Sequence, residues 1–172
     1  MGNGKLFVMN ADGRNELELT SQLEPLLGQD PQWSPFGNRI AYVSNKSGIP
    51  QIYIISADGN NEVQLTRKST GAVSPRWSPD GKNISYLSYH YYGLFIMNLD
   101  TNSEVQVTGN QEEEGAVSHA WAQDGKHLAF WGGAKGKYEL YTTNSTGDDK
   151  VQLTYSSPHA KEISYDLLWS PK

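Results

Sequence analysis

The sequence predicts an all-β protein made of four-stranded antiparallel units, repeated about four times along the chain. Its 172 residues include 17 Gly, 10 Tyr and 5 Trp but only 19% charged residues, a turn-rich and aromatic profile typical of β proteins. A tryptophan motif recurs at intervals of 44, 44 and 48 residues, and a threonine motif keeps step with it. Long helices are not expected.

These two motifs mark the units. The tryptophan motif stands at Trp33-Ser34-Pro35, Trp77-Ser78-Pro79-Asp80-Gly81, Trp121-Ala122-Gln123-Asp124-Gly125 and Trp169-Ser170-Pro171. The threonine motif stands at Glu18-Leu19-Thr20, Gln64-Leu65-Thr66, Gln106-Val107-Thr108 and Gln152-Leu153-Thr154. Because a period of this length is the mark of stacked structural repeats, we interpret the chain as copies of one unit.

Each unit is expected to hold four short strands. The first ends at the tryptophan, and the fourth ends at the threonine. Second strands are expected at 39–44, 83–88 and 127–132, and third strands at 6–10, 52–56, 94–98 and 140–144. Several of these segments are apolar at successive positions, which indicates that both faces of each sheet are covered.

Turn residues separate the strands. In Ser78–Gly81, Pro79 presets φ for the turn, Asp80 can bond to the backbone and Gly81 accepts a left-handed conformation. The same chemistry is found at Asp12-Gly13 and Asp58-Gly59. Asp100-Thr101 lacks the glycine, so we expect a strained turn or another turn type there.

A four-stranded sheet with two apolar faces must stack on copies of itself, and a β-propeller is the usual solution for this repeat length. We therefore predict one propeller domain over 1–172, with units at 29–66, 73–108, 117–154 and a split unit of 165–172 plus 5–20. The split unit has no second strand, so the last blade is predicted to be incomplete. Three arrangements stay open: a small ring, an arc that assembles with a second copy, and a piece of a larger propeller. Open blade edges favour a homo-oligomer.

The segment Pro75–Ser88, followed by Leu94–Asn98 and Gln106–Thr108, resembles the repeat of TolB and related WD-repeat-like propellers. The resemblance covers essentially the whole chain and implies the propeller fold. Similar repeats occur in periplasmic scaffold propellers of the Tol system, in the gating propellers of prolyl-oligopeptidase-like peptidases and in oligogalacturonate lyases. It therefore implies a periplasmic or extracytoplasmic location, although no signal peptide is recognisable. The additional N-terminal α/β domain of TolB has no counterpart, so a specific Tol-system role is not expected.

Residues typical of catalysis or cofactor binding are sparse. The sequence has no cysteine and no G-x-S-x-G nucleophile motif, and its four histidines show neither metal-ligand spacing nor an acidic partner at a fixed offset. Gly132–Lys137 fits a hairpin better than a phosphate loop, because no helix follows. We expect no cofactor and no metal. A binding protein is expected rather than an enzyme.

Charge and hydropathy limit the partners. The net charge is −5, without a basic cluster, which argues against nucleic acid. No apolar run approaches the length needed for membrane insertion. A protein or peptide is the expected partner.

The residues before each inner-strand tryptophan are expected to ring the mouth of the central channel. They are Asp30, Gln32, Ser74, Arg76, Ser118, His119 and Asp166. Polar groups that converge from separate blades form a binding site, and the loop His90–Gly93 could add an aromatic anchor. We expect a non-catalytic scaffold that binds through this mouth and the loops. The alternative is a lyase-like or peptidase-accessory propeller with a metal or carbohydrate site near His119, which would resemble the channel histidine of the lyases.

Overall fold

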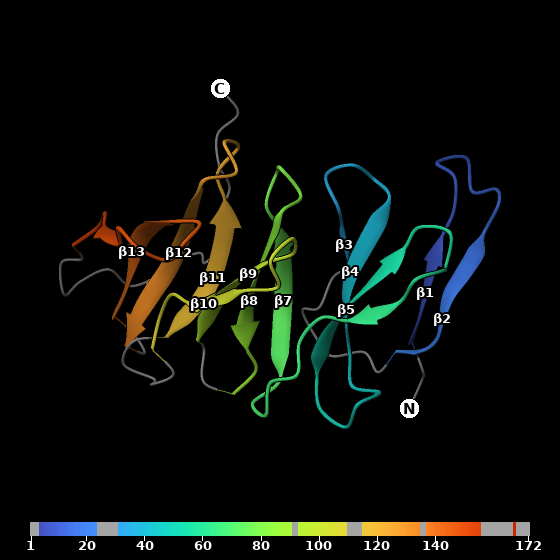
Figure 1. The fold of residues 1–172 in the computed structure, drawn as a ribbon, viewed down its shortest axis with the longest axis horizontal. Coiled ribbons are helices and arrows are strands. Elements are labelled where there is room, and N and C mark those ends of the chain that lie inside the picture. Colours follow the sequence, from blue (N-terminus) through green and yellow to red (C-terminus); the bar gives the residue numbers. More distant parts are fainter. Residues whose placement is uncertain are drawn as a thin grey trace. The chain divides into compact units, whose positions relative to one another are not determined.

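A computed structural model describes residues 4–23, 31–90, 93–109, 115–134, 137–155 and 167. These residues form fourteen β-strands and no helix (Figure 1). The predicted all-β class is confirmed. Within the described residues, no helix has the length and apolar character needed to cross a membrane.

The strands form one two-stranded and three four-stranded antiparallel sheets, in each of which neighbours in sequence are neighbours in space. The first sheet pairs β1 (Gly4–Val8) with β2 (Leu17–Leu23). The second contains β3 (Gln32–Trp33), β4 (Arg39–Ser44), β5 (Gln51–Ser56) and β6 (Val63–Gln64). The third contains β7 (Ala72–Trp77), β8 (Asn83–Ser88), β9 (Leu94–Asn98) and β10 (Glu104–Gln106). The fourth contains β11 (Ala116–Trp121), β12 (His127–Ala134), β13 (Lys137–Asn144) and β14 (Val151–Gln152).

The chain divides into two compact units, Met1–Pro75 and Arg76–Lys172. The first unit holds the β1–β2 and β3–β6 sheets. Strand β7 crosses the division, and the second unit holds the rest of its sheet and the β11–β14 sheet. The C-terminal part of the predicted split repeat, residues 165–172, lies outside the described residues apart from residue 167.

The core of the first unit is an apolar cluster between its two sheets. Its buried members are Leu6, Ile40, Tyr42, Tyr53 and Ile55. The rings of Tyr42 and Tyr53, which are cross-strand partners, stack with centroids 5.8 Å apart. Burial of each large apolar side chain of this kind contributes about 1.5–3 kcal/mol.

The same cross-strand aromatic pair recurs in the second unit. Tyr86 stacks on Phe95 and Phe130 on Tyr141, both with centroids 5.3 Å apart. In each sheet the pair joins the second strand to the third. The repeat therefore extends from the sequence to the packing.

The repeated threonine has a structural role. In every copy its hydroxyl oxygen accepts a hydrogen bond from the backbone N–H of the residue fourteen positions earlier, in the third strand. The pairs are Leu6 with Thr20 (3.1 Å), and Ile52 with Thr66, Leu94 with Thr108 and Leu140 with Thr154 (each 2.9 Å). The glutamine of the motif caps the same segment, because its amide donates to the threonine carbonyl in three copies. The motif thus satisfies backbone groups at the end of the fourth strand.

The turn after the inner-strand tryptophan is closed by a side chain. Ser78 Oγ accepts the Asn83 N–H at 2.9 Å, and Ser34 accepts in the same way from Arg39. In the third copy Ala122 has no hydroxyl, and Asp124 Oδ1 accepts the His127 N–H at 3.2 Å instead. A neighbouring carboxylate therefore replaces the missing group.

The turn at Asp100-Thr101 has another type, as expected from the missing glycine. Gly59 and Gly147 occupy left-handed conformations in their turns, whereas here the positive φ lies one residue later, at Asn102. Asn98 Oδ1 accepts hydrogen bonds from the backbone N–H and the hydroxyl of Thr101, both at 3.0 Å. Side-chain hydrogen bonds thus hold a turn that lacks glycine.

Candidate functional site

The inner strands β7 and β11 present the predicted site residues in one repeating pattern. The two strands have the same order of buried and half-buried positions, and each ends on a tryptophan that is 8% exposed. Ser74 and Ser118 occupy equivalent half-buried positions, and Arg76 is also half-buried. These polar groups are therefore partly accessible, as a binding surface requires.

The other predicted residues divide into two groups. Gln32 is half-buried in β3 of the first unit. Asp30 and Asp166 lie outside the described residues, as does most of the aromatic loop, of which His90 and Gly93 are described. His90 makes an edge contact with the ring of Tyr89, with centroids 4.6 Å apart.

His119 lies in β11, where the sequence places it, but its side chain is buried. Only 4% of the residue is exposed, and it occupies the position of the buried Pro75 in the preceding repeat. Its Nε2 is enclosed without a hydrogen-bond partner. Burial, and then the positive charge of Arg76, lower the pKa of His119 to about 3, although a hydrogen bond with the backbone of Ser85 opposes this shift. The imidazole is therefore neutral at neutral pH.

Two hydrogen bonds fix the backbone near His119 within the second unit. The indole N–H of Trp121 donates to the carbonyl of Arg76 at 3.2 Å. The hydroxyl of Ser85 donates to the same carbonyl at 3.4 Å. The backbone that carries the Arg76 guanidinium is therefore held from two sides, by β11 and by β8.

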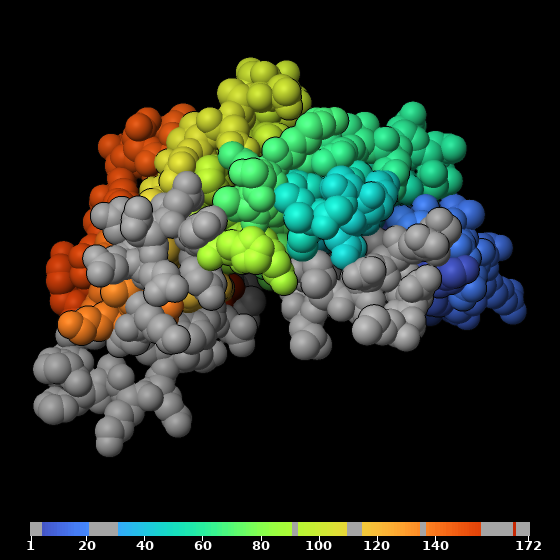
Figure 2. Space-filling model, turned by 90° about the horizontal axis from the view of Figure 1, so that it is seen from below, coloured from blue at the N-terminus to red at the C-terminus, as the bar shows by residue number. Residues whose placement is uncertain are grey.

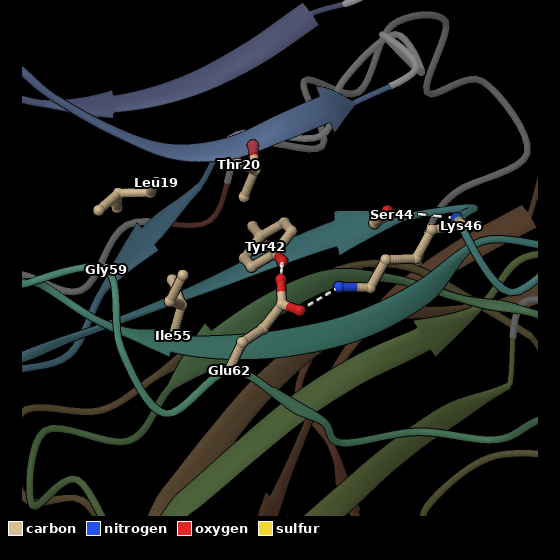
Figure 3. Close-up of a pocket in the computed structure, with 8 residues that line it drawn as sticks. All are labelled: Leu19, Thr20, Tyr42, Ser44, Lys46, Ile55, Gly59 and Glu62. Carbon is tan, nitrogen blue, oxygen red and sulfur yellow. Dashed lines mark hydrogen bonds and ion pairs between the residues drawn. The ribbon is translucent and has the colours of Figure 1, made fainter.

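A pocket of about 370 Å³ lies between the sheets of the first unit (Figure 3). It is lined by Leu19, Thr20, Tyr42, Ser44, Lys46, Ile55, Gly59 and Glu62. The carboxylate of Glu62 accepts hydrogen bonds from the Tyr42 hydroxyl and the Lys46 ammonium. Burial opposes ionisation of Glu62, but these two partners outweigh it and lower its pKa. The charges in this pocket therefore compensate one another.

Sequence reasoning missed this pocket. A signal was present in the repeat, because Tyr42 and Glu62 recur as Tyr86 and Glu104, which are also hydrogen-bonded. Burial and the glutamate raise the pKa of both tyrosines. The Tyr–Glu pair is thus a feature of the repeat, which makes a structural role for it the simpler interpretation.

One histidine has an acidic partner that the sequence analysis did not single out. Asp124 is an acidic partner of His127, three residues away, with Oδ2 and Nδ1 2.7 Å apart. The bond to the Lys126 N–H, followed by His127, lowers the pKa of Asp124 to about 2. The pair is exposed and belongs to the turn described above. Among the described residues, no group of three His, Cys, Asp or Glu side chains is arranged to hold a metal ion.

Comparison with known proteins decides the family. The model of the TolB beta propeller domain matches residues 54–170, more than half of the chain. The chain belongs to the TolB beta propeller domain family. Its sheets are accordingly the blades of a propeller with about four repeats.

Individual TolB relatives share shorter segments or the fold alone. The chain is 45% identical over 49 residues to the Tol-Pal system protein TolB of Bordetella pertussis, which is 28% of this chain and 11% of that protein. It thus spans about a tenth of the length of the curated relatives that it matches. A putative TolB from Agrobacterium tumefaciens superimposes with a TM-score of 0.68 at 18% identity, over 88% of this chain and 56% of that one.

An enzyme shares the same fold. An oligogalacturonate lyase in complex with manganese superimposes with a TM-score of 0.67 at 17% identity, covering 94% of this chain and 45% of the lyase. At this identity the likeness shows the fold alone. The TolB-like blades of this chain must be judged by their own residues.

Proposed function

We propose that this TolB-like propeller is a non-catalytic scaffold, which binds a protein or peptide through the inner-strand residues at the channel mouth and the adjoining loops. Membership of the TolB propeller family supports a scaffold. The half-buried polar side chains of Gln32, Ser74, Arg76 and Ser118 support the surface. Each stands on an inner strand at a repeat position.

Arg76 gives this surface its chemistry. Its guanidinium carries five N–H donors in a planar fork, which suits a carboxylate of a peptide side chain or C-terminus. Its backbone is fixed by Trp121 and Ser85. A donor on a rigid strand loses less entropy on binding than one on a free loop. We therefore expect acidic or carboxyl-terminal peptides to be preferred.

The burial of His119 is the observation that favours a scaffold over the alternative, a lyase-like or peptidase-accessory propeller with a metal or carbohydrate site near this residue. A general acid or base must reach its substrate and titrate near the working pH. His119 is 4% exposed, and its pKa is lowered to about 3. A cation held at its Nε2 would also be repelled by Arg76, whose charge already acts on the imidazole. His119 is better suited to holding two blades together.

Selection from a phage-displayed library of random peptides tests this proposal. Peptides selected on the wild-type chain would be measured by titration calorimetry against the wild type, Arg76→Glu and Ile49→Glu. Ile49 is an exposed apolar residue in a turn of the first unit, so its variant controls for added negative charge. We expect Arg76→Glu to weaken binding about tenfold or more and Ile49→Glu to leave it unchanged.

Two results would contradict the proposal. Equal binding by wild type and Arg76→Glu would place the partner elsewhere. Stoichiometric manganese binding that His119→Ala abolishes would instead favour the enzyme-like alternative. We also propose an extracytoplasmic location, because the chain belongs to the TolB propeller family. Fractionation of cells that produce the native protein would test this location.

A further inference from the structure

A glycine turn of one blade docks on the fourth strand of the preceding blade, and the structure shows this contact twice. In the first unit Gly59 lies beside Leu17 and Leu19 of β2. In the second unit Gly147 lies beside Val105 and Val107, which belong to β10 and the residues after it. Both glycines are in the turn between the third and fourth strands of their blades. The same contact is therefore made once in each unit.

The absence of a side chain makes this approach possible. A Cβ added at Gly147 would lie 2.6 Å from Val105 Cγ1 and 3.6 Å from Val107 Cγ2. A Cβ at Gly59 would lie 3.5 Å from Leu19 Cδ2. A carbon–carbon separation of 2.6 Å is well inside van der Waals contact. At Gly147 a side chain would therefore collide with Val105, whereas at Gly59 an added Cβ would only reach ordinary van der Waals contact.

The last blade of the second unit carries the same apolar positions uncovered. Val151 and Leu153 of the β14 segment are 52% and 51% exposed, whereas Val107, the counterpart of Leu153, is 8% exposed. Val151 and Leu153 alternate along an extended segment and so share one face. Tyr155, two residues further on, is 80% exposed. Figure 2 shows the orange to red residues of this blade at the surface.

The first unit carries the complementary turn, also uncovered. Gly13 has φ of 78°, equal to that of Gly147. No described atom lies within 4 Å of a Cβ built at Gly13. All residues from Asn10 to Glu16 are exposed, and the blue residues of this part lie at the surface in Figure 2. A turn with the geometry of a docking turn is therefore available.

We propose that two copies of this chain associate head to tail, with the Asp12-Gly13 turn of one copy docked on Val151, Leu153 and Tyr155 of the other. A second copy is the expected occupant because the contacts at Gly59 and Gly147, one inside each unit, pair the same turn position with the same strand positions. Different surfaces of the two copies meet, so the contact is heterologous. The contact would cover the apolar side chains of Val151, Leu153 and Tyr155, which are otherwise exposed to water.

Analytical ultracentrifugation of the chain over a range of concentrations tests association. We expect the wild type to sediment as a dimer or larger species that dissociates on dilution. Leu153→Glu should raise the apparent dissociation constant about tenfold or more, because it places a charge where the turn must pack. Tyr155→Lys is a second variant of the same surface, and its 80% exposure makes an effect on folding small.

The turn is tested separately with Gly13→Asn. Asparagine tolerates a left-handed conformation. In the docked turn, however, its side chain would occupy the space that corresponds to the one Val105 fills beside Gly147. We expect the same loss of association as for Leu153→Glu. Gly48→Asn is the matched control, since Gly48 also has a positive φ and no described atom within 4 Å of an added Cβ.

Mixing distinguishes this contact from non-specific adhesion. Gly13→Asn retains an intact strand surface and Leu153→Glu an intact turn, so an equimolar mixture should recover a dimer, although neither variant associates alone. A wild type that is monomeric at every concentration would overturn the proposal. So would variants that associate like the wild type, or a mixture of monomers that stays monomeric.

Discussion

The indole N–H of Trp121 donates a hydrogen bond to the main-chain carbonyl of Arg76, 3.2 Å away. The two residues lie on the inner strands β11 and β7 of successive blades. The repeated tryptophan therefore connects one blade to the next, in addition to filling the core. The same bond holds the backbone of the arginine that we propose as a contact for a partner.

Trp121→Phe should destabilise the chain by about 1–3 kcal/mol. The substitution keeps an aromatic ring but leaves the Arg76 carbonyl with one donor fewer in a half-buried setting. Urea denaturation followed by circular dichroism measures the change. Trp33→Phe is the control: Trp33 is 50% exposed, so its variant should stay within about 0.5 kcal/mol of the wild type. Equal losses for the two variants would contradict the assigned role of the bond.

Thr66→Val should also cost about 1–3 kcal/mol, since valine matches threonine in shape but cannot pair with the Ile52 N–H or the Gln51 side chain. Thr66 is 1% exposed. Thr154→Val removes the equivalent hydroxyl, but Thr154 is half-buried. We expect a smaller loss there, because water can reach the freed N–H. The same urea experiment applies, and the opposite order would contradict this explanation.

The Tyr–Glu pair should show energetic coupling. Phe130 and Lys150 stand where the other repeats have Tyr86 and Glu104, which suggests that the two positions change together. We expect Tyr86→Phe combined with Glu104→Lys to cost less than the sum of the single variants, by about 1 kcal/mol. A double-mutant cycle from urea denaturation measures this difference. Additive losses would mean that the hydroxyl and carboxylate act independently.

The free energy of unfolding should decrease as the pH is lowered, because His119 is buried in its neutral form. Its pKa is about 3 in the folded chain, against about 6.5 when unfolded. The unfolded state therefore binds the proton first, and the stabilisation is complete above pH 6.5 and lost as the pH falls towards 3. His119→Leu should remove this part of the slope, on the order of a few kcal/mol. Urea denaturation at pH 7 and pH 4 gives the comparison, and parallel changes in wild type and variant would contradict it.

The repeat could be predicted from the sequence because its signals are local. Spacing of tryptophans and threonines, β-branched runs and turn residues are all set by neighbours in the chain. Thr101 stands where other repeats have glycine, and this difference correctly indicated another turn type. The Gly132–Lys137 segment, of which 132–134 and 137 are described, joins β12 and β13 as a hairpin.

The side-chain environment of the site could not be predicted in the same way. His119 precedes a tryptophan on an inner strand, as the channel residues do, but the alternation along β11 turns its side chain into the contact with the neighbouring blade. The accessible positions are those of Ser118 and Arg76. The pairing of His127 with Asp124 depends on Ala122, which lacks the hydroxyl that closes this turn elsewhere. Such effects depend on which neighbours a residue meets in space.

Hydrogen exchange at the indole N–H of Trp121, followed by nuclear magnetic resonance, tests most directly whether the blades are stacked through their repeated tryptophans. The account predicts that this proton exchanges only when the blades separate, at a rate close to that of the slowest backbone amides of β11. Exchange at the rate of a free indole would show that Trp121 does not bind the neighbouring blade, and would contradict the account.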